Sequence, residues 1–230
     1  MTKQFEIGGK PVSDSGLYPW SLGSISRALF FYGESSFLVS EKTATLAITT
    51  YYSLFHLSIF MVYQCPHLLD DNKREEINKR LKQGVKDPRN EISHDNVLTF
   101  LEKCSFLGLP KYYIDTYRQA REFREFMNYG PNIRVDSGNK IIDSCNFSFR
   151  KENQIASQLN SLFETAILWS VKNSYDSGLW VPIALDQSKY FFDNNGFYSS
   201  WSTRANLAQS EMLREYLHKL SVTTLNKNKK

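Results

Sequence analysis

Cysteines are few in this 230-residue chain, and their spacing forms no recognisable framework. Cys65, Cys104 and Cys145 are an odd number, lie far apart and form no CxxC pair. This usage indicates reduced thiols in a cytoplasmic setting and argues against a disulfide framework. Cys65 and His67 are close in sequence, but no second pair completes the four ligands of a zinc site. We therefore expect no metal and no cofactor.

Several familiar enzyme motifs are also missing. The chain has no GxxxxGK[ST] phosphate loop, no GxGxxG, no HExxH and no GxSxG nucleophile elbow. Its first residues lack the apolar core of a secretory signal, so we expect a cytoplasmic protein. The net charge of +4 permits an anionic partner without requiring one.

Charged residues are absent from residues 43 to 63. An uncharged segment of this length could cross a membrane. Threonine, serine and histidine recur along it, however, which is a heavy polar load for hydrocarbon. Apolar character on all sides also marks a helix buried inside a protein, and we favour that interpretation.

Apolar residues at helical spacing predict an all-α protein, an antiparallel four- to five-helix bundle with short connections. Proline and glycine signals set most of the expected boundaries. The Asp87-Pro88 pair resembles an N-cap followed by a first-turn proline, which predicts a helix from there to about Cys104. A first helix is expected to carry Ile25, Leu29, Tyr32 and Ser36 on one face. Four further helices are expected over about 44–62, 70–86, 111–129 and 151–175.

The predicted domain organisation has four parts. Residues 1–20 form an N-terminal extension and residues 21–176 form the helical bundle. A C-terminal elaboration, residues 177–222, is expected to pack on the bundle, with a small aromatic β-hairpin turning at 193–196 and a last helix from about 204 to 220. The lysine-rich residues 223–230 are expected to be a disordered basic tail.

Arg89, Asn90 and His94 form the clearest candidate catalytic group. Histidine titrates near neutral pH, so it can take a proton from a ribose 2′-OH or give one to a leaving 5′ oxygen. Arginine offers a planar fork of donors to a phosphate, and Asn90 could orient the phosphate or the histidine. The alternative is that these residues only cap a helix or pair with surface carboxylates.

Two flanking segments give this group its context. With them, the chain resembles the HEPN superfamily over roughly residues 24–175, through Tyr51, Tyr52, Phe55 and His56 (a YYxxFH-like stretch), Arg89, Asn90 and His94 (R-x4-6-H), and Arg124, Tyr129 and Gly130 (R-x4-Y-G-like). The resemblance implies a metal-independent endoribonuclease whose composite active site lies across a homodimer. It also implies a toxin or antiphage effector, with an antitoxin or regulatory protein as a possible partner.

Further residues complete the expected site. Arg121, Arg124 and Lys86 are candidates for binding the RNA backbone, although placement of arginines near a helix C-terminus also explains the first two. His56 is expected to be a hydrogen-bonded core residue without a chemical role. Asn96 stands where related toxins carry a modifiable tyrosine, so regulation through that tyrosine is not expected. The alternative function is a catalytically silent HEPN-like bundle that binds protein or nucleic acid.

Overall fold

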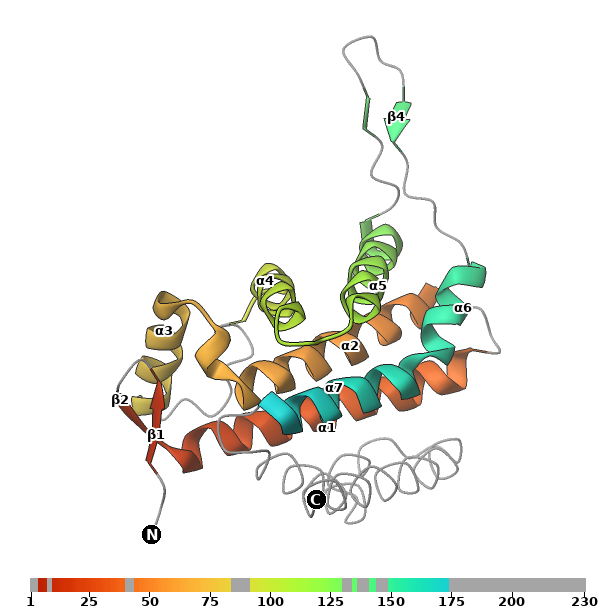
Figure 1. Ribbon diagram of the computed structural model, residues 1–230. Coiled ribbons are helices and arrows are strands. Elements are labelled where there is room, and N and C mark those ends of the chain that lie inside the picture. The colour runs from red at the N-terminus through yellow and green to blue at the C-terminus, as the bar shows by residue number, and fades with distance from the viewer. Residues whose placement is uncertain are drawn as a thin grey trace.

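The computed structural model describes residues 4–7, 10–39, 44–83, 92–129, 134–135, 141–143 and 149–173. Helices dominate this part of the chain, which confirms the prediction of a helical protein (Figure 1). The α-helices are α1 (Asp14–Leu38), α2 (Ala44–Gln64), α3 (Asp71–Lys82), α4 (His94–Ser105), α5 (Lys111–Tyr129), α6 (Phe149–Ser157) and α7 (Leu159–Asn173). A single 3-10 turn, Pro66–Leu68, follows α2.

Two short antiparallel ribbons accompany the helices and were not predicted. The first pairs β1 (Gln4–Ile7) with β2 (Lys10–Ser13) ahead of α1. The second pairs β3 (Arg134–Val135) with β4 (Ile141–Asp143), and it projects from the helices beyond the end of α5 (Figure 1).

Helix α2 lies at the centre of the described structure. It contacts α1, α4, α5, α6 and α7, and nearly all of its side chains from Leu46 to Gln64 are buried. By length and composition it is the one described helix that could span a membrane, but most of it is buried inside the protein. This burial agrees with the central helix predicted from the sequence.

Small polar residues line the contact between α1 and α2. The Ser53 hydroxyl donates to the Ala28 carbonyl oxygen at 2.9 Å, and the Gln64 amide donates to the Ser21 hydroxyl at 3.1 Å. Short side chains let the two helices approach closely, and these buried polar groups find hydrogen-bond partners across the contact. The polar load of α2 is therefore accommodated within the protein interior.

The start of α4 differs from the prediction. The helix begins at His94 and Ser93 is its N-cap, so the predicted helix from Pro88 to Cys104 is wrong at its N-terminal end. Ser93 and Asn96 form a capping box in which each satisfies a backbone N–H of the other. This reciprocal pair fixes the helix start at the histidine.

Other predicted elements differ in extent or lie outside the described residues. The predicted helix over 151–175 is two helices, α6 and α7, separated by a turn at Gln158. Helix α1 begins at Asp14, ahead of Pro19 and within the predicted N-terminal extension. The predicted aromatic hairpin, the last helix and the basic tail lie outside the described residues.

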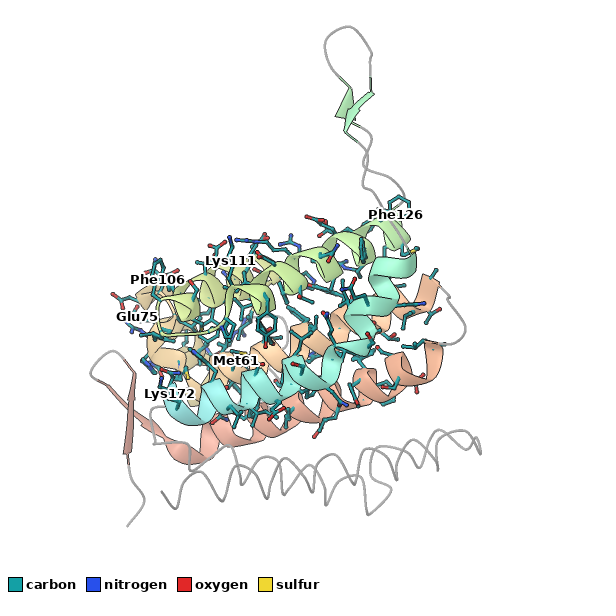
Figure 2. The ribbon with its side chains drawn as sticks, turned by 45° about the vertical axis from the view of Figure 1, so that its right-hand side comes forward. Met61, Glu75, Phe106, Lys111, Phe126 and Lys172 are labelled. Carbon is teal, nitrogen blue, oxygen red and sulfur yellow. The ribbon has the colours of Figure 1, made fainter. Side chains whose placement is uncertain are left out.

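The turn between α4 and α5 presents an apolar side chain to solvent. Gly108 adopts a positive φ of 84°, and the Trp169 indole N–H donates to the Leu107 carbonyl oxygen at 3.2 Å. These features hold the turn against α7. Phe106 is 88% exposed at the outside of the turn, whereas Met61 is buried among the helices (Figure 2).

His56 belongs to the core, as predicted, whereas the hydrogen bond predicted for its ring stays a prediction. Its side chain is buried, and its ring stacks on Phe31 with centroids 5.7 Å apart and an interplanar angle of 8°. We expect His56→Ala to lower the free energy of unfolding by about 1 to 3 kcal/mol, because the substitution removes a packed polar ring from the core. Urea unfolding followed by circular dichroism measures this, with His67→Ala as a control at an exposed histidine. Equal effects of the two substitutions would contradict a core role for His56.

Candidate functional site

His94 is the first residue of α4, and the local sequence explains its placement. Val97, Phe100, Leu101 and Cys104 form the buried stripe of this helix. The capping box turns the chain into the helix immediately before the histidine. His94 is consequently held half-buried at the end of α4 that faces the middle of α2 and α5.

The phenol of Tyr51 makes the closest polar contact of His94. The Tyr51 hydroxyl is hydrogen-bonded to Nδ1 of the imidazole, between residues 43 positions apart in the sequence. The Phe55 ring packs against the same imidazole, with centroids 4.3 Å apart. Tyr51 and Phe55 lie on one face of α2, so the His94 ring packs against that face of the central helix.

A buried arginine covers the other side of Tyr51. The Arg124 guanidinium carbon lies 5.0 Å from the centroid of the Tyr51 ring, which is a cation–π contact. The Arg124 side chain is only 8% exposed, and a carboxylate oxygen of Glu125 lies 3.8 Å from its Nη2. Nε of Arg124 has no hydrogen-bond partner among the described residues. Arginine side chains are seldom buried this deeply, and burying a cation is costly unless it is paired.

Arg121 ties the start of α4 to α5. Its Nη1 donates to Asp95 at 2.7 Å and its Nε donates to Glu125 at 2.9 Å. The pair with Asp95 bridges two helices, and Asp95 directly follows His94 in the chain. Arg121 thus fixes the first turn of α4 over α5 and contributes positive charge beside the imidazole.

Burial and neighbouring charges shift the pKa values of the side chains in the site. Burial raises the pKa of Tyr51 to about 12, so its phenol keeps its proton at neutral pH. The pKa of Tyr117, whose hydroxyl lies 3.4 Å from that of Tyr51, is also raised by burial. Desolvation lowers the pKa of His94, and the Arg124 and Arg121 cations lower it further. At pH 7 the imidazole is therefore mainly neutral.

The structure brings together part of the predicted site. His94 from α4 meets Arg121 and Arg124 from α5 around Tyr51. Arg89, Asn90 and Lys86 lie outside the described residues, so their placement stays a prediction.

Tyr51 is the site residue that sequence reasoning missed. Its side chain is fully buried. Its contact with His94 was not foreseen, although a phenol on a buried helix needs a hydrogen-bond partner. That requirement was the available signal.

No group of three or more His, Cys, Asp or Glu side chains that could hold a metal ion occurs within the described part of the chain. Comparison with models of protein families, with curated protein sequences and with solved structures gives no match to this chain.

The charges around His94 predict how its pKa changes when one of them is removed. Arg121→Gln removes a cation and releases Asp95 and Glu125 from their ion pairs, and both changes favour the imidazolium form. We expect the pKa of His94 to rise, which NMR titration of the histidine ring protons measures. Arg118→Gln is the matched control, because Arg118 lies on the same helix but pairs with Glu102 and Asp115 instead. An unchanged pKa in Arg121→Gln would contradict the electrostatic description of the site.

Proposed function

We propose that this protein is a metal-independent endoribonuclease of the HEPN type. One observation supports the proposal most: the three segments that carry the resemblance meet around one half-buried histidine, with Tyr51 from the first, His94 from the second and Arg124 from the third. In this proposal, the helices around α2 form the antiparallel four- to five-helix bundle of that superfamily.

The proposed chemistry is attack of a ribose 2′ oxygen on the neighbouring phosphorus. His94 takes the 2′ proton, the bond from phosphorus to the 5′ oxygen breaks, and a 2′,3′-cyclic phosphate forms. Arg89 stabilises the negative charge that develops on the phosphate, and Asn90 orients it. Arg121 and Lys86 contribute positive charge along the path of the RNA backbone.

A dimer follows from the proton balance of this reaction. One group must accept the 2′ proton while another supplies a proton to the leaving 5′ oxygen, and each chain offers one histidine in the proposed site. A two-fold axis that brings two copies of His94 to one cleft supplies both groups. The interface then runs along α4 and its neighbour α5.

Sedimentation velocity tests the oligomeric state. We expect a dimer at micromolar concentration, because a composite site needs both chains. Glu122→Arg, an exposed position on α5 one residue from Arg121, should weaken the dimer and cleavage together if the interface follows that helix. Glu164→Arg, the same substitution at an exposed position on α7, is the control. A monomer that retains full activity would contradict the composite site.

Cleavage itself is tested with purified protein, free of any inhibitor, and single-stranded RNA in EDTA. We expect cutting that leaves a 2′,3′-cyclic phosphate. His94→Ala should lower the rate by about two to four orders of magnitude, the usual cost of losing a group that transfers protons, and Arg89→Ala should do nearly the same. Thr99→Ala, at an exposed position on the same helix, is the matched control.

Two results would contradict the proposal. The first is RNA cutting that His94→Ala and Arg89→Ala leave unchanged, since a contaminating nuclease would then be the source. The second is the absence of cutting by the wild-type protein on any single-stranded RNA, with the protein folded and dimeric.

The proposed setting is a cytoplasmic toxin–antitoxin or antiphage system, in which this chain is the effector and a protein partner restrains it. The second candidate function is a silent HEPN-like module that binds a partner. The exposed Phe106 and Leu107 at the α4–α5 turn favour it, because a large apolar side chain held outward on a fixed turn suits a protein contact. The cleavage experiment separates the two functions.

A further inference from the structure

We infer that Tyr51 is a positioning residue: its hydroxyl holds His94 through Nδ1 and thereby makes Nε2 the ring atom that exchanges protons with the substrate. The catalytic consequence rests on the proposed function, whereas the positioning itself is a property of the folded chain. The sequence resemblance assigned Tyr51 to the YYxxFH-like stretch without giving it a chemical role.

Tyr51 is well placed to orient another residue. Its side chain is fully buried, packs against Phe55 and Tyr117, and is covered by the Arg124 guanidinium. These contacts from α2 and α5 leave the phenol little freedom to move. A hydrogen bond from such a fixed group to a half-buried imidazole fixes the orientation of the imidazole as well.

The hydroxyl serves His94 in each of its protonation states. Tyr51 stays protonated at neutral pH, so its O–H can donate to Nδ1 of the neutral ring. When Nδ1 carries the proton, the O–H of Tyr51 turns away and the same oxygen accepts from Nδ1–H. The ring reaches this form from the other neutral tautomer by losing the proton at Nε2 and gaining one at Nδ1, and it need not change its position. A carboxylate in this place could only accept.

Nε2 is left for the reaction. No hydrogen bond to Nε2 of His94 is found among the described residues, whereas Nδ1 is engaged. In the base form Nδ1–H donates to Tyr51 and Nε2 accepts the 2′ proton. In the acid form both nitrogens carry protons, and Nε2 gives its proton to the leaving 5′ oxygen while Nδ1–H remains bonded to Tyr51. Every proton is thus accounted for at Nε2.

The experiment compares wild type, Tyr51→Phe, His94→Ala and the double variant. Phenylalanine keeps the ring and its packing but removes the hydroxyl. Tyr52→Phe is the matched control, since Tyr52 is the neighbouring tyrosine on α2 and its ring packs near Phe31 and His56. Two readouts are taken: kcat and KM for RNA cleavage as a function of pH, and the ¹⁵N resonances of the His94 ring by NMR, which need no activity.

We expect Tyr51→Phe to lower kcat by about ten- to a hundredfold with KM nearly unchanged, the size of effect seen when a histidine loses the partner that orients it. The pH dependence of kcat should shift as well. In the His94→Ala background, Tyr51→Phe should cause no further loss, because Tyr51 acts through the histidine. In the NMR spectrum, the Nδ1 resonance of His94 should move toward that of a ring without a hydrogen bond, and Tyr52→Phe should leave it in place.

Two outcomes would overturn the inference. One is an unchanged Nδ1 resonance in Tyr51→Phe, which would mean that the hydroxyl does not hold the ring. The other is an equal loss of activity from Tyr51→Phe with and without His94, which would mean that Tyr51 acts through the fold. If the wild type cuts no RNA, the proposed function fails, and the NMR measurement still decides whether Tyr51 positions His94.

Discussion

The burial of α2 on several sides is the constraint on which the rest of this structure depends. A helix without charged side chains must be covered, and α1, α4, α5, α6 and α7 all contact it. Its polar groups must then find partners inside the protein. The Tyr51 hydroxyl reaches His94, and this places the start of α4 against α2. The candidate site is therefore a consequence of how the central helix satisfies its own polar atoms.

Elements with clear boundary signals were predictable from the sequence. Helix α5 runs from Lys111 to Tyr129 as expected, because Pro110 precedes it and Gly130-Pro131 follows it. The start of α4 was not, because Asp87-Pro88 and Ser93 with Asn96 are both capping signals, and the choice between them depends on packing. The β1–β2 ribbon had an available signal in Gly8-Gly9, a pair typical of two-residue hairpin turns.

The site could be predicted only in part, for a physical reason. Local spacing identifies histidine and arginine as chemically capable residues, and their order along the chain identifies the resemblance. Contacts between Tyr51, His94 and Arg124 depend on how α2, α4 and α5 pack, and periodicity carries no information about which polar atoms meet across helices. The buried phenol of Tyr51 is both a packing group and a hydrogen-bonding group, and its position in the sequence shows only that it can be either. The pairing of Arg121 with Asp95 was hidden for the same reason.

In the proposed function, this protein cuts RNA by activating a ribose 2′-OH at His94. The most direct measurement compares a short single-stranded RNA that the protein cuts with the same RNA carrying one 2′-deoxyribose on the 5′ side of the cut. We expect the substitution to abolish cutting at that bond and to leave cutting at other sites unaffected. Cutting at the substituted bond would contradict attack by the ribose 2′ oxygen, because the attacking oxygen would then have to come from elsewhere.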